Sequence, residues 1–168
     1  MTARRLILMR HATQTGAAVR DHDRPLTSKG RDEAFQVGAR LSEDGPIPQF
    51  VLSSTALRCQ ETWQAVAGGL GASVLAEFDP GLYNASSRDL LLGIAGIDEN
   101  IEVLLVLAHN PGISMLAADL ALTRDKDVDL PGGGFSPAST ACFEIEGPWS
   151  EISARRARLI RFDRTPRT

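Results

Sequence analysis

Few features of this 168-residue sequence point to a secreted, disulfide-bonded or membrane-embedded protein. Its two cysteines, Cys59 and Cys142, are too few and too far apart for a disulfide framework, so we expect buried thiols in a reducing compartment. The sequence has no apolar run long enough to cross a membrane and no signal-peptide pattern near its start. We therefore expect a cytoplasmic protein that does not bind membranes.

An excess of charge of one sign is also missing. The 18 Lys and Arg residues nearly balance the 21 Asp and Glu residues, and the net charge of −3 argues against nucleic acid as a partner. The sequence contains neither a Cys/His cluster with zinc-ligand spacing nor a calcium-loop pattern, so we expect no metal and no other cofactor. Any anion-binding site must therefore come from a local concentration of Arg and His.

The sequence does contain alternating strand and helix patterns, which extend over a single predicted domain at residues 1–162, followed by a tail at 163–168. Apolar or β-prone runs predict strands at residues 6–9, 49–53, 74–76, 102–108, 140–145 and 157–162. This alternation predicts an α/β fold: a three-layer sandwich with a mostly parallel central sheet and helices on both faces.

The predicted helices have recognisable start signals. Thr27 is placed to cap a helix over residues 28–41, Ser87 to cap a helix after a loop at 77–87, and Pro111 to occupy the first position of a fourth helix. Another helix follows the second strand from residue 57. The stretch at 130–138, with three successive glycines, follows no predicted strand and lacks the Lys-Ser/Thr of a P-loop, so we interpret it as a flexible connection.

Cationic and imidazole side chains follow the ends of several predicted strands. Arg10 and His11 end the first strand, His109 ends the fourth, and Arg58 lies in the first turn of the helix after the second. Ligands bind at the carboxyl ends of strands in open α/β sheets, and parallel neighbours would bring these four residues together. Two arginines and two histidines around one point predict a phosphate pocket.

Each of these residues also has a structural interpretation. Arg58 could be an exposed helix residue that pairs with Glu61 three positions later, and His109 could be a hydrogen-bonded histidine at a strand end. His22, in the polar loop at 13–24, is expected to be solvent-exposed rather than to line the pocket. The sequence alone leaves these alternatives open.

Several segments resemble motifs of the histidine phosphatase superfamily. Residues 8–12, Leu-Met-Arg-His-Ala, are similar to its Arg-His-Gly signature with Ala12 in place of glycine, and residues 53–62 are similar to its Ser-x-x-x-x-Arg-x-x-Glu-Thr segment. The Arg-Pro-Leu-Thr-x-x-Gly segment at 24–30, the Leu-Tyr pair at 82–83 and the His-Asn-Pro segment at 109–111 most resemble SixA-type phosphohistidine phosphatases.

The resemblance implies a catalytic role for each of the four residues. His11 would attack phosphorus and form a covalent phosphohistidine intermediate, while Arg10, Arg58 and His109 would bind the phosphate oxygens. The resemblance also implies that Arg24 contributes to substrate binding. A backbone carbonyl or a neighbouring side chain is expected to hold the other ring nitrogen of His11.

The expected substrate is a phosphohistidine-bearing protein, such as a two-component phosphotransfer domain. A phosphatase of small phosphorylated metabolites is the alternative, and a non-catalytic phosphate- or phosphoprotein-binding module is a lesser one. Mutase-like relatives carry a glutamate as general acid where Asn84 stands here, and an amide cannot donate a proton as an acid. Glu77 and Asp79 are the nearby carboxylates that could replace it.

Overall fold

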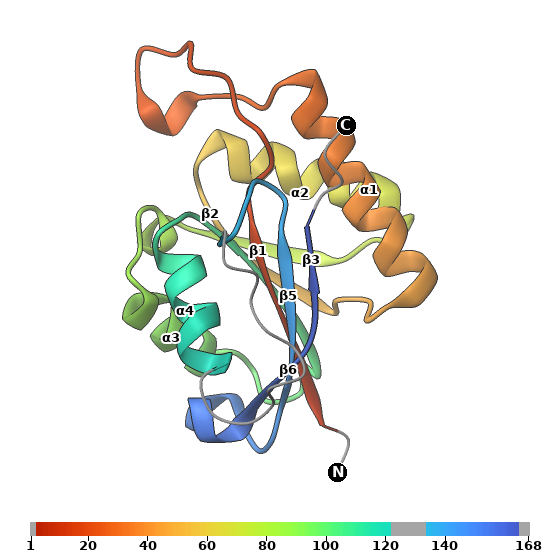
Figure 1. Cartoon of the computed structure of the whole chain (residues 1–168), viewed down its shortest axis with the longest axis vertical. Coiled ribbons are helices and arrows are strands. Elements are labelled where there is room, and N and C mark those ends of the chain that lie inside the picture. Colours follow the sequence, from red (N-terminus) through yellow and green to blue (C-terminus); the bar gives the residue numbers. More distant parts are fainter. Residues whose placement is uncertain (1–2, 122–133, 165–168) are drawn as a thin grey trace.

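The computed structural model describes residues 3–121 and 134–164 and confirms the α/β architecture. A six-stranded sheet lies between two layers of helices (Figure 1). The strands are β1 (Arg4–Arg10), β2 (Phe50–Ser54), β3 (Leu75–Asp79), β4 (Val103–Ala108), β5 (Thr140–Ile145) and β6 (Ala157–Asp163). The helices are α1 (Ser28–Asp44), α2 (Leu57–Leu70), α3 (Ser87–Ala95) and α4 (Gly112–Ala121), with 3₁₀ turns at Asp21–Asp23, Pro80–Leu82, Trp149–Glu151 and Ala154–Arg156.

The strand order places the carboxyl ends of β1, β2 and β4 next to one another, at the same rim of the sheet. The order is β3-β2-β4-β1-β5-β6, in which the first four strands are parallel, β5 is antiparallel to β1, and β6, antiparallel to β5, runs in the direction of the first four again. Arg10 at the end of β1 pairs with Ala108 at the end of β4, and Ser53 of β2 pairs with Leu107. The residues that follow these three strands therefore meet at the same rim.

The unbroken apolar run of β1 has a helix layer on each side. Leu6 and Leu8 belong to the core beneath α3 and α4, while Ile7 and Met9 belong to the core beneath α1 and α2. Figure 1 shows these two helix pairs on opposite faces of the sheet. Successive side chains of a strand point to opposite faces, which explains why the sequence of β1 shows no alternation.

Helices α1 and α2 pack closely because glycines lie at their contact. A Cβ atom built on Gly38 would lie 2.0 Å from the Val66 carbonyl oxygen, and one on Gly69 would lie 2.0 Å from that of Phe35. A third glycine, Gly30, brings α1 against the chain that follows His11, since a Cβ there would lie 2.1 Å from the Thr13 carbonyl oxygen. Gly30, the glycine of the segment at 24–30, therefore allows α1 to pack against the loop next to His11.

Three local predictions need correction. The third strand is longer than expected and includes residues 77–79, because β3 pairs along its whole length with β2, although its side chains are mostly exposed and show little apolar pattern. Ser86, not Ser87, caps α3, since its side chain accepts from the amide of Asp89 in a capping box. Pro111 precedes α4 by one residue, whereas Thr27 caps α1 as predicted.

Several sequence predictions fall partly outside the described residues. Positions 130–133 of the predicted connection at 130–138 and positions 165–168 of the predicted tail at 163–168 are not described, while Asp163, expected in the tail, is the last residue of β6. Cys59 and Cys142 are buried free thiols, as expected. None of the helices in the described part of the chain is both long and apolar enough to span a membrane.

Candidate active site

Two histidines from neighbouring strands meet at the rim of the sheet. His11 follows β1 and His109 follows β4, and their ring centroids lie 5.3 Å apart. The backbone amide of His11 donates to the Ala108 carbonyl at 3.2 Å, so the ladder between the two strands continues into the site. Each histidine is 4% exposed. The backbone therefore holds both rings in a buried position at the rim of the sheet.

The His11 ring has a defined orientation and tautomer. Its Nδ1 lies 2.9 Å from the carbonyl oxygen of Ala12, which can only accept a hydrogen bond, so Nδ1 carries the proton. A neutral imidazole of this tautomer has its lone pair on Nε2. The amide of Ala12 donates in turn to Thr62 Oγ1, which also donates to the carbonyl of Arg58. The predicted backbone contact to His11 is confirmed.

Both histidines are neutral at neutral pH. Burial is the main cause that lowers the pKa of His11 to about 4, and the Arg10 and Arg58 charges lower it further against the opposing effect of the Ala12 carbonyl. Burial likewise lowers the pKa of His109 to about 3, with His11 and Arg58 as further causes. The nucleophilic form of His11 is therefore the resting form.

These pKa shifts predict a loss of stability in mild acid. Between the ordinary pKa of 6.5 and about 4, the unfolded chain takes up a proton on position 11 that the folded protein does not, so the free energy of unfolding falls as pH falls. His11→Ala and His109→Ala should each remove about 2 kcal/mol of the difference between pH 7.5 and pH 5.0, measured by urea unfolding. If a variant loses as much stability as the parent between pH 7.5 and pH 5.0, the lowered pKa of the histidine that it replaces is contradicted.

His109 is held from the side of β2. Its Nε2 lies 2.7 Å from Ser54 Oγ and 3.7 Å from the thiol of Cys59. Since Ser54 Oγ already accepts from the amide of Ala56, its hydroxyl hydrogen is available to Nε2, an arrangement that leaves the His109 proton on Nδ1. Burial raises the pKa of the Cys59 thiol to about 12, so this cysteine is a neutral neighbour and not a nucleophile.

The two arginines reach the pocket from different elements. Arg10 donates through Nη1 to the carbonyl of Phe135, and burial together with the Arg58 charge lowers its pKa. Arg58 is 4% exposed, and its two terminal nitrogens bind Asp21, not Glu61. Glu61 instead accepts from the amide of Leu26. The structural interpretation of Arg58 as an exposed partner of Glu61 is therefore wrong.

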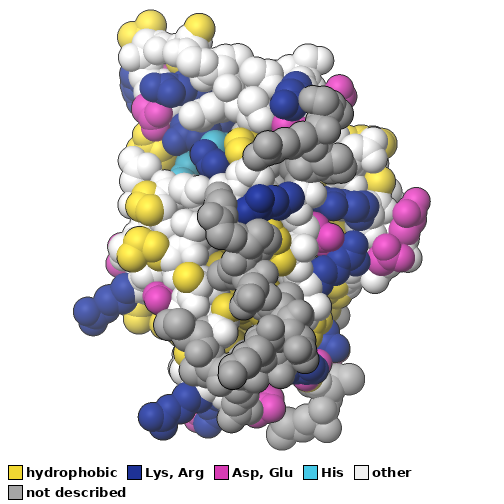
Figure 2. All heavy atoms as spheres, viewed as in Figure 1, with side chains coloured by type: hydrophobic (Ala, Val, Ile, Leu, Met, Phe, Trp, Pro, Cys, Tyr) yellow, Lys and Arg dark blue, Asp and Glu magenta, His cyan; other side chains and the backbone are white. Residues whose placement is uncertain are grey.

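Three buried nitrogen atoms of the four central residues have no hydrogen-bond partner in the described part of the chain. Among the described residues, Arg10 Nε, Arg58 Nε and His109 Nδ1 are inaccessible to solvent and bind no acceptor. A buried donor without an acceptor is costly, and such groups call for an explanation. A segment that we call the arm, residues 13–24, projects from the molecule, and Figure 2 shows His and Arg side chains gathered below it. The arrangement suits an anion with several oxygens, such as a phosphoryl group.

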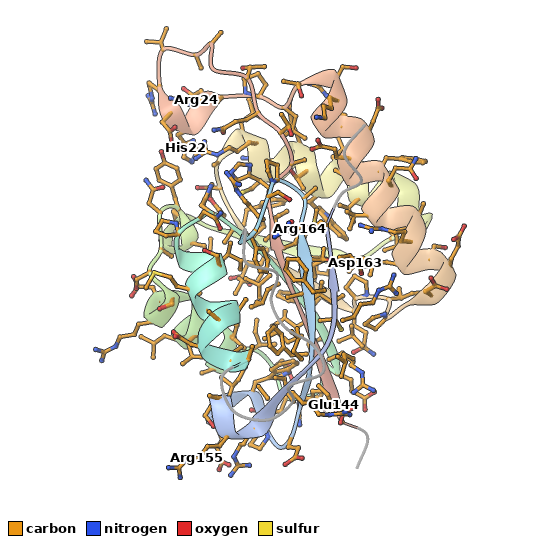
Figure 3. All side chains as sticks on the ribbon, viewed as in Figure 1. His22, Arg24, Glu144, Arg155, Asp163 and Arg164 are labelled. Atoms are coloured by element: carbon orange, nitrogen blue, oxygen red, sulfur yellow. The ribbon has the colours of Figure 1, made fainter. Side chains whose placement is uncertain are left out.

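Arg24 and His22 lie on this projecting arm (Figure 3). The Nε of Arg24 lies 3.4 Å from a carboxylate oxygen of Asp21, and its role in substrate binding stays a prediction. His22 is half-buried rather than solvent-exposed, because its Nε2 contacts Thr55 Oγ1 at 2.9 Å and its ring packs on Tyr83 at 4.9 Å.

Two residues at the rim were missed as site residues by sequence reasoning. Asp21 binds Arg58, and Tyr83 donates its hydroxyl hydrogen to the same carboxylate while its ring lies 5.6 Å from that of His109. The Leu-Tyr pair at 82–83 was a signal for Tyr83, since it belongs to the resembled segments. Asp21 had no comparable signal beyond its position three residues before Arg24.

The carboxylates considered as general acids are not engaged with the histidines by any described contact. Asp79 caps the turn at Pro80–Leu82 by accepting from the amide of Gly81, and Glu77 is exposed on the edge strand β3. Asn84 is exposed and has a φ of 54°, a left-handed conformation that asparagine adopts more readily than most residues. Its backbone conformation alone is a reason for asparagine at this position.

Known proteins resemble this chain both in sequence and in structure. The family model described as histidine phosphatase superfamily (branch 1) matches residues 6–89. An uncharacterised protein of Mycobacterium tuberculosis is 30% identical over 158 residues, covering 92% of this chain and 98% of that protein. The phosphohistidine phosphatase SixA of Escherichia coli is 31% identical over 123 residues, covering 68% of this chain and 73% of that one.

A solved structure shares the whole fold. The structure of a protein proposed to be a phosphohistidine phosphatase SixA, from Nakamurella multipartitia, superposes with a TM-score of 0.86 and 30% sequence identity, covering 98% of both chains. The likeness therefore extends over β5 and β6, beyond the residues matched by the family model.

Proposed function

Because the chain belongs to the histidine phosphatase superfamily, and to its SixA type, we propose that it hydrolyses phosphohistidine in a protein through a covalent intermediate on His11. The observation that supports this most directly is the hydrogen bond from His11 Nδ1 to the Ala12 carbonyl. It leaves the Nε2 lone pair free on a neutral ring that lies within the field of the Arg10 and Arg58 charges. An anion-binding module would have no need of such a nucleophile.

In the first step, His11 Nε2 attacks phosphorus while the bond from phosphorus to the substrate's leaving atom breaks. When that atom is an imidazole nitrogen, the substrate ring carries a proton beforehand, so the leaving imidazole departs neutral. Arg10, Arg58 and the Nδ1–H of His109 bind the oxygens of the transferring group and stabilise its charge. In the second step, water attacks phosphorus, the bond from phosphorus to His11 Nε2 breaks, and dihydrogen phosphate leaves with the water protons while the imidazole recovers its lone pair.

Charge stabilisation in this proposal comes from the protein's own cations, and the reaction proceeds without a metal ion. In the described ranges, 3–121 and 134–164, no cluster of three or more His, Cys, Asp or Glu side chains is suited to hold a metal. Arg10 and Arg58 carry two fixed positive charges into the pocket, which is where the phosphoryl charge develops. Helix termini add only partial charge to this effect.

The experiment that tests the proposal compares substrates directly. The purified protein is incubated with a phosphohistidine-bearing phosphotransfer domain and with a panel of phosphorylated metabolites, and phosphate release is measured with and without EDTA. We expect the phosphoprotein to be the best substrate and EDTA to have no effect. Faster release from a metabolite would favour the metabolite phosphatase, and a loss of activity in EDTA that a divalent metal restores would refute metal independence.

Arg58→Ala and His109→Ala should each slow turnover far more than they destabilise the fold. Both side chains present buried, unpartnered donors, and removing one preorganised donor to a developing oxyanion costs on the order of 10²-fold in kcat. The measurement is kcat for each variant beside its urea unfolding curve. If a variant loses activity only in proportion to its loss of folded protein, the side chain that it lacks has a structural role in the parent.

A further inference from the structure

Asp21, near the end of the arm, contacts three site residues. Its backbone carbonyl accepts from Arg58 Nη1 at 2.8 Å, and its carboxylate accepts from Arg58 Nη2 at 3.1 Å. The carboxylate also accepts from the Tyr83 hydroxyl and lies 3.4 Å from Arg24 Nε. The hydrogen bond from Tyr83 is the main cause that lowers the pKa of Asp21, with Arg58 and Arg24 as further causes, so this residue stays ionised.

These contacts occupy one edge of the Arg58 guanidinium and leave another free. Both terminal nitrogens bind Asp21, whereas Nε is buried and has no partner among the described residues. A guanidinium is planar, so fixing its terminal nitrogens also fixes the direction of its Nε–H. The Arg58 side chain is only 5% exposed, and its orientation is therefore set by Asp21 rather than by solvent.

We propose that Asp21 is a positioning residue, which binds the terminal nitrogens of Arg58 and thereby fixes the orientation in which the guanidinium meets the transferring phosphoryl group. The inference rests on the proposed function, because it assigns Arg58 to that phosphoryl group. The competing interpretation is that Asp21 occupies the position of a substrate oxygen and must be displaced before the phosphoryl group binds. The two interpretations predict opposite effects on kcat.

Tyr83 extends the same arrangement to the turn that follows β3. Its hydroxyl holds the Asp21 carboxylate, and its ring lies 5.6 Å from His109 and 5.9 Å from the Arg58 guanidinium carbon. Asp21 therefore connects the arm, helix α2 and the turn after β3 around Arg58. Such bracing keeps a buried donor in place, and misplacement of a reacting group by about 1 Å can cost roughly 10²-fold in rate.

The kinetic test uses Asp21→Asn, which keeps the shape of the side chain and removes its charge, with para-nitrophenyl phosphate as the probe. We expect kcat to fall about 10-fold without a rise in KM, because one negative charge near the anion is also lost. Asp23→Asn is the matched control, since Asp23 lies in the same turn and its described contacts are with Arg20 and His22. It should leave kcat unchanged.

A double-mutant cycle shows whether Asp21 acts through Arg58. In an Arg58→Ala background, Asp21→Asn should have no further effect on kcat, because the group it orients is gone. An additional 10-fold loss in that background would overturn the proposal. An unchanged or higher kcat with a lower KM in the single variant would overturn it too, in favour of displacement by the substrate.

An NMR measurement tests the positioning without any turnover. In the parent, the Nη hydrogens of Arg58 should give separate, slowly averaging signals, identified by their loss in Arg58→Lys, and in Asp21→Asn these signals should average. Equal signals in both proteins would overturn the proposal. A parent that hydrolyses neither phosphohistidine nor the aryl phosphate would refute the proposed function, while the NMR result would still decide how Arg58 is held.

Discussion

His11→Ala is expected to abolish phosphate release while the protein stays folded. No other described side chain offers an unprotonated imidazole nitrogen in the same place, since His109 uses its Nε2 to contact Ser54. Loss of a nucleophile costs on the order of 10⁴-fold or more in kcat. The measurement is phosphate release by the variant and the parent at equal folded concentrations, with folding checked by urea unfolding at pH 7.5.

The parent should also yield the covalent intermediate. Rapid quenching in base during turnover of labelled substrate should leave the label on the peptide that contains His11, because a phosphorus–nitrogen bond survives base better than acid. The label should be absent from His11→Ala. A variant with turnover close to that of the parent would show that another residue accepts the phosphoryl group, and the mechanism proposed above would be wrong.

The second large effect concerns the leaving group, and we expect the order phosphohistidine, then activated aryl phosphate, then alkyl phosphate. An alkyl ester expels a strongly basic alkoxide unless an acid protonates it, and a correctly placed general acid contributes roughly 10²- to 10⁴-fold. The resemblance to the superfamily implies that Asn84 stands where mutase-like members have that acid. The measurement is kcat/KM for a series of phosphate esters plotted against leaving-group pKa, and we expect a steep slope.

Asn84→Glu tests the origin of that slope, with Asn84→Gln as a control of equal size that cannot supply an acid. Both substitutions place a longer side chain at a left-handed residue and should cost about 1 kcal/mol of stability. Only the glutamate should flatten the slope. If the parent hydrolyses sugar phosphates as fast as phosphohistidine, the missing acid must be sought in Glu77 or Asp79, and the protein is a metabolite phosphatase.

Sequence reasoning succeeded where local pattern and sheet geometry coincide. The apolar runs of β1 and β4 predicted buried strands, and the parallel order of those strands then required His11 and His109 to approach each other. The edge strand β3 was underestimated because its side chains are mostly exposed and its existence depends on pairing with β2. Pairing of this kind is a tertiary effect that local pattern does not report.

The partners of the site residues were harder to predict than the residues themselves. Arg58 has an acidic neighbour three positions later on its own helix, yet it binds Asp21, which is 37 positions away in the sequence. Helical spacing favoured Glu61, but that carboxylate is engaged by the amide of Leu26. Contacts between the arm and helix α2 depend on the path of the arm in the folded protein. The sequence of the arm has no hydrophobic periodicity from which that path could be predicted.

The place of β1 in the sheet has a consequence for the order in which a newly made chain can fold. β1 leaves the ribosome first, but its parallel neighbour β4 begins at Val103 and its antiparallel neighbour β5 begins at Thr140. An apolar strand that must wait for partners so distant in sequence folds slowly and exposes a surface prone to aggregation. The His11–His109 pair therefore forms only after β4 has been synthesised, and recovery of activity during refolding reports the assembly of β4 beside β1.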